Sequence, residues 1–420
     1  MARCSLRRVT FDEIPEARFR ASDAEADSTA ASIIDEVRSG GEKALRRRAE
    51  ALGELGPGEA LFLDRSDLER ALASIGGKDR ALLERSHRRI ADFATAQRGC
   101  LLDLEFPVPG GSAGHRFIPV GRAGCYVPGG RFPLASSALM TATPARVAGV
   151  GSVWCAGPRP GRETLAAAAI AGAEGFLAAG GAQAIAALAF GCGPISGRDV
   201  IVGPGGRYVA AAKRLLFGVI GTEAPAGPSE LLIIAGSGAD PCLVAADLIA
   251  QAEHDPAAAP ALVVFDEKLI LSIEDELGRR LASLPQPNAG IAAAALEKGG
   301  WVFVALDRVE ACAAADRFAP EHLELIVDDP QNWDGHIANA GAVFLGAGSA
   351  EVLGDYGAGP NHCLPTGGAA RFAAGLSVLA FLRARTWLRM DDSREVAGDA
   401  AAFARMEGLE GHALAAELRK

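Results

Sequence analysis

The stretch that decides the fold is "VGSVWCAGPRPGRETLAAAAIAGAEGFLAAGGAQAIAALAFG" (150–191), where short β-forming runs alternate with alanine-rich runs. "VGSVWCAGP" predicts a strand and a loop, and "RETLAAAAIAGA" predicts a helix. "EGFLAAGG" and "AQAIAALAFG" predict a second strand and a second helix, and "RDVIVGPGG" followed by "RYVAAAKRLLFG" (198–218) predicts a third pair. Strands separated by helices at this interval predict a parallel sheet.

The alternation continues towards the C-terminus. Further strands are predicted at the starts of "SELLIIAGSG" (229–238), "PALVVFDEKL" (260–269), "GWVFVAL" (300–306) and "GAVFLGAGSAE" (341–351). "CLVAADLIAQAEHD" (242–255) predicts a helix between the first two. Residues 24–110 carry apolar positions at helical spacing, and the tail 393–420 is also predicted to be helical. The sequence therefore predicts an α/β protein with helical N- and C-terminal regions.

Length, charge and apolar content limit the class of protein. A chain of 420 residues is too long for one ordinary core, so two domains are expected. The net charge is −10 and there is no basic stripe, which argues against a nucleic-acid partner. The most apolar region, 165–193, is interrupted by Glu174 and Gln183, which is typical of a buried core and not of a membrane span.

The cysteines and the N-terminus predict a cytoplasmic protein. None of the eight cysteines forms a CxxC pair, so they are interpreted as free thiols in a reducing compartment. The N-terminal "MARCSLRRVTFDEI" (1–14) is basic but has no apolar stretch, so it does not predict a secretory signal.

Three glycine-rich turns each join a predicted strand to a predicted helix: "VPGG" (127–130), "AGGAQ" (179–183) and "VGPGG" (202–206). Glycine allows a ligand to approach the backbone, and the following helix N-terminus favours an anion such as phosphate. None of them has the GxGxxG pattern, and each one alone is more typical of a structural turn.

Several polar motifs are candidates for chemistry, each with an ordinary alternative. Gln251 and His254 lie three apart on a predicted helix and could hold a metal, although this spacing alone favours a polar helix face. "LGDYGAGPNHCLPTGG" (353–368) places Asp355 and His362 on a constrained loop, where a structural and a functional interpretation are equally supported.

Glu321 and His322 lie side by side in "FAPEHLELIV" (318–327), either as an acid–base couple or as the solvated start of an element. Ser229 of "AGPSE" (226–230) could cap a helix or bind a ligand, and the motif is not GxSxG. The tail "MEGLEGHALAAELR" (406–419) carries Glu407 and His412, and a lone histidine in a tail is usually a surface residue.

Together these motifs resemble the histidinol dehydrogenase family. The similar stretches, in the family's order, include "YVPGG", "GGAQAIAALAFG", "VGPG", "AGPSELLIIA", "DLIAQAEHDP", "APEHLEL", "GDYGAGPNHCLPTGG" and the terminal E-G-L-E-G-H. The resemblance implies a zinc- and NAD-dependent oxidation of L-histidinol to L-histidine through a bound aldehyde, in histidine biosynthesis. It also implies a homodimer in which the C-terminal segment of one chain completes the other's site.

The resemblance assigns roles to residues of this chain. Glu321 and His322 would be catalytic: His322, with a pKa near neutrality, would take the hydroxyl proton, and Glu321 would deprotonate the water that attacks the aldehyde. Zinc would orient the substrate's amine and imidazole. The implied zinc ligands are Gln251, His254, Asp355 and His412; the implied substrate-binding residues are Ser229, Gln251, His254, His322, Asp355, His362, Glu407 and His412; the implied cofactor-binding residues are Tyr126, Gln183 and Gly206.

The resemblance also implies the domain organisation, with two incomplete Rossmann-like parallel-sheet domains that lack GxGxxG, plus small helical N- and C-terminal segments. The expected bounds are an N-terminal arm at 1–21, a first α/β domain formed by 22–125 and 231–376, a second, cofactor-binding α/β domain at 126–230, and a helical tail at 377–420 that contributes to the partner's site.

Departures from the family pattern gather around the cofactor domain. Gly206 stands where the family has an asparagine, Glu223 is a longer acid than usual, and Thr141 replaces a frequent asparagine. Two alternatives therefore stay open. One is a related dehydrogenase of another small alcohol such as a sulfonated propanediol, although Glu407 would repel a sulfonate. The other is a catalytically weakened metabolite-binding relative.

Overall fold

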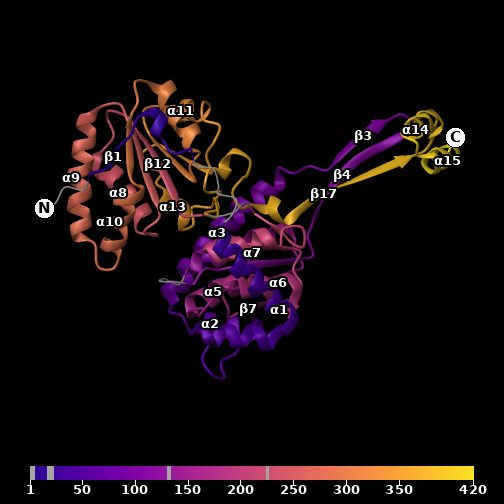
Figure 1. Ribbon diagram of the computed structural model, residues 1–420, viewed down its shortest axis with the longest axis horizontal. Coiled ribbons are helices and arrows are strands. Elements are labelled where there is room, and N and C mark those ends of the chain that lie inside the picture. Colours follow the sequence, from indigo (N-terminus) through magenta and orange to yellow (C-terminus); the bar gives the residue numbers. More distant parts are fainter. Residues whose placement is uncertain (1–4, 17–22, 130–133, 224–226) are drawn as a thin grey trace.

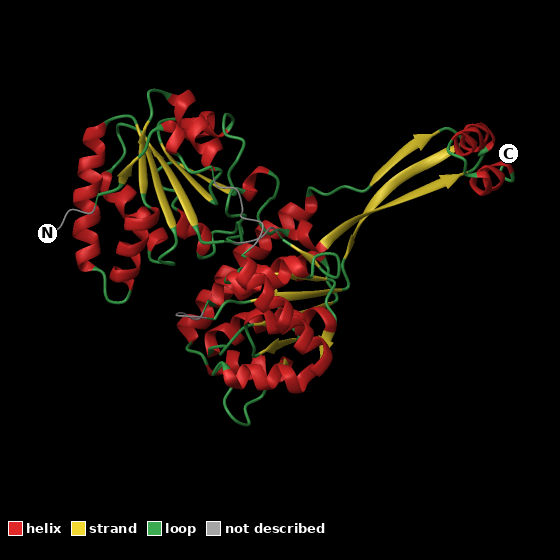
Figure 2. Cartoon of the chain, in the orientation of Figure 1, coloured by secondary structure: helices red, strands yellow, loops and turns green. Residues whose placement is uncertain are grey.

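The computed structural model describes residues 5–16, 23–129, 134–223 and 227–420. Figures 1 and 2 show two α/β units, each built on its own sheet, and a long arm that carries the C-terminus. The mixed α/β class with parallel sheets and no GxGxxG turn, predicted from the sequence, is confirmed. None of the helices in the described ranges is both long and apolar enough to cross a membrane.

The first sheet has six strands, all parallel to their neighbours. In spatial order they are β1 (Arg7–Arg8), β14 (Trp301–Val304), β13 (Ala259–Val264), β12 (Glu230–Ala235), β15 (His322–Ile326) and β16 (Ala342–Leu345). The short β1 brings the N-terminal arm onto the edge of this sheet. β12 is buried along its whole length and β13 in all but its first residue, which explains the continuous apolar runs in "ELLIIA" and "PALVV".

Helices cover both faces of the first sheet. Leu231 and Ile233 of β12 pack with α8 (Pro241–Ala252), α9 (Glu267–Ser283) and α10 (Asn288–Gly299). Leu232 and Ile234 point to the opposite face, where α11 (Arg308–Phe318) and α12 (Pro330–Asp334) lie. The period of two along a strand therefore divides one apolar run between two cores.

The second sheet also has six strands: β11 (Gly221–Thr222), β10 (Val200–Val202), β5 (Arg122–Tyr126), β6 (Ser152–Ala156), β7 (Gly175–Leu177) and β2 (Phe62–Asp64). All neighbouring pairs are parallel except β2 with β7. One face is covered by α1 (Ala24–Ala51), α6 (Gly181–Phe190) and α7 (Arg207–Leu215), and the other by α2 (Arg65–Ser74), α3 (Gly77–Gly99), α4 (Ala135–Ala148) and α5 (Arg162–Ile170). A short antiparallel hairpin of two-residue strands, β8 (Gly191–Cys192) and β9 (Ile195–Ser196), follows α6.

The predicted domain bounds need correction, because residues 22–125 were expected to join 231–376. In the described part of that range, α1 packs on α6 and α7, α2 packs on α5, α3 packs on α4, and β2 extends the second sheet. Helical periodicity predicts which face of a helix is buried, but it does not specify which sheet that face meets. The connection after β16 also returns to this unit, since Val378 and Phe381 lie in its core.

The tail was predicted to be helical over 377–420, and this is wrong for residues 378–390. Residues 378–381 form the 3-10 turn η3 (Val378–Phe381), and β17 (Leu382–Met390) is a nine-residue strand. β17 pairs antiparallel with β4 (Gly111–Pro119), which pairs with β3 (Leu104–Val108). This three-stranded arm extends away from both units and carries α14 (Arg394–Met406) and α15 (Glu410–Glu417) at its end (Figures 1 and 2).

The carboxyl ends of strands in the second sheet face the amino end of β12 in the first sheet. In the second sheet, the carboxyl ends of β5 and β10 lead into Pro128 and Gly205, which line a cavity. The facing wall of that cavity comes from Ser229, which precedes β12, and from His254, which lies between α8 and β13. β5 and β10 are neighbours at the point where the strand order of the second sheet reverses, the usual place for a ligand in such a sheet.

Candidate active site

Glu321 and His322 lie at the start of β15, buried at 6% and 4% exposure. Both side chains are hydrogen-bonded to the backbone of Glu230 on the neighbouring strand β12. The Glu230 N–H donates to Oε2 of Glu321 at 3.0 Å, and Nδ1 of His322 lies 3.1 Å from the Glu230 carbonyl. Because a carbonyl only accepts, Nδ1 carries the proton, and Nε2 is left with a lone pair and no partner among the described residues.

Burial sets the charge of this pair. Loss of solvation lowers the pKa of His322 to about 3, with smaller contributions from His254 and His362, so the imidazole is neutral. The near-neutral pKa expected from the sequence is therefore wrong for this buried ring. Burial is also the main cause that raises the pKa of Glu321 well above its usual value, and the nearby Glu230 and Asp355 act in the same direction.

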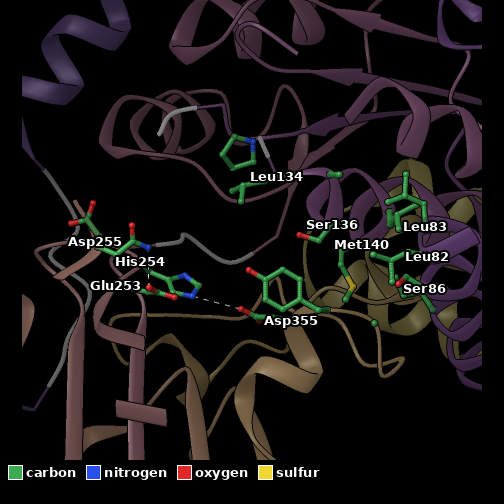
Figure 3. A pocket seen from close by; sticks show the side chains of 17 residues that line it. Leu82, Leu83, Ser86, Leu134, Ser136, Met140, Glu253, His254, Asp255 and Asp355 are labelled. Atoms are coloured by element: carbon green, nitrogen blue, oxygen red, sulfur yellow. Dashed lines mark hydrogen bonds and ion pairs between the residues drawn. The ribbon is translucent and has the colours of Figure 1, made fainter. Parts of the chain in front are cut away.

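A second group of polar side chains lies at the end of α8. Gln251 is fully buried in its last turn, and His254 follows one turn later. Glu351 and Asp355 come from α13 (Glu351–Asp355). His254, Glu351 and Asp355 can each offer one ligand atom, and these three atoms lie within 4.8 Å of one another. Figure 3 shows His254 facing Asp355, and Nε2 of His254 lies 3.9 Å from Oδ2 of Asp355.

This group has the chemistry of a metal site. An imidazole and carboxylates are donors that suit a divalent cation such as zinc. Burial raises the pKa of Asp355 to about 6, with His254 opposing the shift. Among the described side chains, no lysine or arginine ion pair neutralises Glu351 or Asp355. The structure thus brings together Gln251, His254 and Asp355 as the sequence predicted, and adds Glu351, which the sequence interpretation had placed at the end of a strand and turn.

His362 lies on the loop that follows α13. Its Nδ1 is 3.2 Å from the carbonyl of Asp355, and its Nε2 is 3.5 Å from Oγ of Ser137 on α4. Burial lowers the pKa of His362 to about 4, so this ring is neutral as well. The loop therefore joins the candidate metal site to the second unit through His362.

Two cavities meet at His254. The larger, about 820 Å³, is lined by Glu253, Asp355 and Tyr356 from the first unit and by Leu139 and Met140 of α4 (Figure 3). The smaller, about 680 Å³, is lined by the loop between β10 and α7, including Gly206, and by Ser229. His254, Asp255 and Pro128 line both. Neither Glu321 nor His322 lines either cavity.

The predicted cofactor residues are not all in the same place. Gly206 caps the N-terminus of α7 and lines the smaller cavity. Tyr126 and Gln183 are buried outside the two cavity walls. The Tyr126 hydroxyl accepts the Gly181 N–H at 3.0 Å, and the Gln183 amide donates to Glu54 at 3.2 Å.

Lys213 and Glu223 hold the loop that leads to Gly206. The Lys213 ammonium donates to the Gly203 carbonyl at 2.5 Å and to Glu223 at 2.6 Å, and the Gly203 N–H donates to the same carboxylate oxygen at 2.8 Å. Gly203 has a φ of 117°, and a Cβ there would lie 2.0 Å from the carbonyl oxygen of Tyr126. Glu223, although longer than the family's usual acid, therefore still fixes this loop.

Glu407 and His412 lie away from the other site residues of their own chain. Glu407 follows α14 and His412 belongs to α15, and both are exposed. Figure 1 shows these helices at the far end of the arm, remote from α8 and α13. Within one chain, the structure does not bring these two residues to His254.

The imidazole–carboxylate cluster of His254 and Asp355 lines a cavity near the switch point of a parallel sheet, and the neutral His322 and the carboxyl group of Glu321 are buried at the start of β15. This arrangement is that of an α/β enzyme with a ligand site near the switch point of one of its sheets. A family model described as histidinol dehydrogenase matches residues 16–420. The chain belongs to the histidinol dehydrogenase family.

Individual proteins with similar sequences or structures include several histidinol dehydrogenases and one dehydrogenase of another alcohol. Histidinol dehydrogenase of Thermus thermophilus is 46% identical over 429 residues, covering 100% of this chain and 98% of that protein. The enzyme of the same name from Cereibacter sphaeroides is 43% identical, covering 94% and 92%. Sulfopropanediol 3-dehydrogenase of Ruegeria pomeroyi is 40% identical, covering 86% and 85%. The crystal structure of histidinol dehydrogenase from Elizabethkingia anophelis matches with a TM-score of 0.92 at 28% identity, covering 100% and 98%.

Proposed function

We propose that this enzyme oxidises L-histidinol to L-histidine through bound L-histidinaldehyde, using zinc and two molecules of NAD, as the last steps of histidine biosynthesis. The observation that carries the proposal is the neutral His322, with its open Nε2, close to the cluster of His254 and Asp355. Membership of the family and the cavity beside Gly206 support the substrate and the cofactor.

In the first oxidation, His322 acts as the base. Its Nδ1–H is held by the Glu230 carbonyl, so Nε2 is the atom that would accept the hydroxyl proton, and a bound NAD would supply the hydride acceptor. The hydrogen bond to Glu230 also favours the imidazolium that forms, because a charged Nδ1–H donates a stronger hydrogen bond to the carbonyl than a neutral one does.

In the second oxidation, Glu321 acts on water. Attack of water on the aldehyde needs a group that removes its proton, and the hydrated aldehyde then gives the second hydride. A carboxylate whose pKa is raised by burial is a stronger base once it is ionised. The Glu230 N–H keeps the Glu321 side chain in place for this step.

Gln251, His254, Asp355 and His412 of the partner subunit would hold the zinc. The ion would supply a fixed positive charge that binds the substrate's amine and imidazole and so orients its alcohol. Ser229 and His362 are proposed to contact the substrate, and the partner's Glu407 is proposed to lie against its ammonium group.

Charge around the larger cavity favours a cationic amino alcohol over a sulfonated diol. Glu253, Asp255 and Asp355 line this cavity, and none of its described lining residues is a lysine or an arginine. Carboxylates attract an ammonium group and repel a sulfonate.

Substrate comparison tests the proposal. Purified enzyme with zinc and NAD is expected to form two NADH for each histidine produced from L-histidinol, and to turn over a sulfonated propanediol far more slowly. Preference for the diol would support the related dehydrogenase instead. Absence of NADH with both alcohols, together with no NAD binding at millimolar concentration, would support a catalytically weakened relative.

Introducing asparagine at position 206 is expected to strengthen NAD binding. A Cβ at Gly206 meets no atom within 4 Å, and no positive φ forbids a side chain there. The family's asparagine therefore fits at the wall of the smaller cavity. Gly206→Asn is expected to lower the KM for NAD by about fivefold to tenfold, the value of roughly one hydrogen bond, with kcat unchanged.

Gly238→Asn is the matched control for this gain. Gly238 also has open space around it and lies in the turn after β12, outside both cavities. An equal change of KM in both variants, or none in Gly206→Asn, would show that position 206 does not contact the cofactor.

We also propose that two chains form a homodimer in which each arm completes the partner's site. Glu407 and His412 are exposed at the end of the arm. The described cluster consists of His254, Glu351 and Asp355, and the arm of the same chain is too far away to bring His412 to it. The arm helices also expose Phe403, Met406 and Leu414, which are apolar side chains suited to burial against another subunit.

Mixed dimers test this exchange. Chains carrying His322→Asn and chains carrying His412→Ala are each expected to be inactive alone. When they are co-refolded, a mixed dimer contains one intact site, so about a quarter of wild-type activity is expected from random pairing. If each arm served its own chain, no mixed dimer would be active, and the recovery would be absent.

A reducing compartment is proposed for the enzyme. The seven cysteines that the structure describes are all free, including Cys125 and Cys155, which face each other on β5 and β6. This supports the cytoplasmic location expected from the sequence.

A further inference from the structure

We infer that Glu351 is a positioning residue that orients the side-chain amide of Gln251, so that the amide oxygen is the atom offered to the metal. The inference rests on the proposed zinc site. It concerns a residue that does not itself need to touch the ion.

When Glu351 is ionised, the amide of Gln251 has one satisfactory orientation. With its nitrogen directed at Glu351, Nε2 lies 2.9 and 3.2 Å from the two carboxylate oxygens. In the opposite orientation the amide oxygen would face a carboxylate, which offers no proton when ionised. Gln251 is fully buried and Glu351 is 3% exposed, so water does not replace either partner.

Orientation matters because the two ends of an amide differ in chemistry. The oxygen has lone pairs that bind a divalent cation, whereas the nitrogen carries two protons and does not. The two ends are almost equal in size, so packing alone discriminates poorly between them. A carboxylate that accepts from the nitrogen fixes the oxygen on the other branch of the amide.

Glu351 is itself held by the strand of the catalytic pair. Its backbone N–H donates to Oε1 of Glu324 at 2.7 Å. Glu324 lies on β15, two residues after His322, and is 1% exposed. The contact from β15 through Glu324 and Glu351 to Gln251 therefore links the position of one proposed zinc ligand to the strand that carries His322.

The rival role for Glu351 is direct metal binding, since one of its oxygens lies within 4.8 Å of ligand atoms of His254 and Asp355. The two roles predict different coupling with Gln251. A residue that acts through Gln251 has no further effect once that side chain is removed, whereas an independent ligand keeps its full effect.

The test is a zinc-affinity cycle on the full-length protein, measured by competition with a chromophoric chelator. Glu351→Gln is expected to weaken zinc binding by about 10- to 100-fold, the usual effect of losing a residue that orients a metal ligand. In the Gln251→Ala background, the same substitution is expected to cause no further loss. Glu274→Gln, which alters a buried carboxylate bonded to the Leu6 N–H, is the matched control and should leave zinc affinity unchanged.

A swapped variant covers the case in which Glu351→Gln folds poorly. Glu351→Gln combined with Gln251→Glu restores a buried amide–carboxylate hydrogen bond, and the carboxylate at 251 offers only oxygens. It should recover zinc affinity to within about tenfold of wild type, within the range expected for such supporting contacts. Unchanged affinity in folded Glu351→Gln, an additive loss in the Gln251→Ala background, or no recovery in the swapped variant would overturn the inference. Failure of the wild-type protein to bind zinc would instead refute the proposed metal site.

Discussion

Replacing His322 by asparagine is expected to reduce alcohol oxidation by about 10²- to 10⁴-fold, the usual contribution of a general base. Asparagine can still donate to the Glu230 carbonyl in place of Nδ1–H, so β15 should keep its position. It has no counterpart of the open Nε2. Stopped-flow measurement of NADH formation from L-histidinol checks the first step directly.

Glu321→Gln completes this experiment by addressing the other step. Its amide oxygen can still accept the Glu230 N–H, but the amide cannot remove a proton from water. When L-histidinaldehyde is supplied, Glu321→Gln is expected to be the more impaired variant, whereas His322→Asn is the more impaired with L-histidinol. His336→Asn, at an exposed histidine, is the control. Equal loss of the aldehyde step in both variants, with alcohol oxidation retained, would disprove this division of roles.

Asp355→Asn is expected to abolish tight zinc binding and to reduce turnover by at least about a thousandfold, because it removes a ligand and not only a supporting contact. Zinc at 100 times its Kd should stabilise the wild-type fold by about 2.7 kcal/mol. The corresponding rise in melting temperature should be lost in Asp355→Asn and retained in His115→Asn, a change in the arm. A normal zinc-dependent rise in Asp355→Asn would place the metal elsewhere.

The affinity for zinc should also depend on pH. Burial raises the pKa of Asp355 to about 6, so below that pH its carboxyl group is increasingly protonated and the proton competes with the metal. Zinc affinity in the wild-type protein is expected to fall as the pH drops through about 6. Calorimetric titrations at several pH values measure this decrease, and a constant affinity between pH 5 and 7 would contradict it.

Local patterns in the sequence predicted much of the fold. Apolar runs such as "ELLIIA" and alanine-rich helices such as "RETLAAAAI" identified the parallel sheets. Assignment of helices to sheets failed for α1, because its apolar face would fit either unit and only three-dimensional contacts decide between them. β17 was assigned to a helical tail because the helices α14 and α15 dominate that region. The strand could not be recognised locally, because its partner β4 is more than 260 positions away in sequence.

Most residues of the candidate site were predicted, but features that depend on partners distant in sequence were not. The resemblance to the family predicted Gln251, His254, Asp355, Glu321 and His322 as site residues, and they lie on or next to β12, β15, α13 and the end of α8. The free nitrogen of His322 could not be predicted, because it depends on the carbonyl of Glu230, a strand neighbour 92 residues away. Glu351 was missed although it lies four residues before Asp355, because α13 is too short to show a helical pattern.

The separate walls of the two cavities bear on the order in which molecules leave the enzyme. The two proposed oxidations would require the first NADH to depart and a second NAD to enter while the aldehyde is retained. Gly206 lines only the smaller cavity, Met140 and Tyr356 line only the larger one, and His254, Asp255 and Pro128 line both. On the proposed function, spent cofactor would be exchanged through the smaller cavity while the aldehyde is held in the larger one.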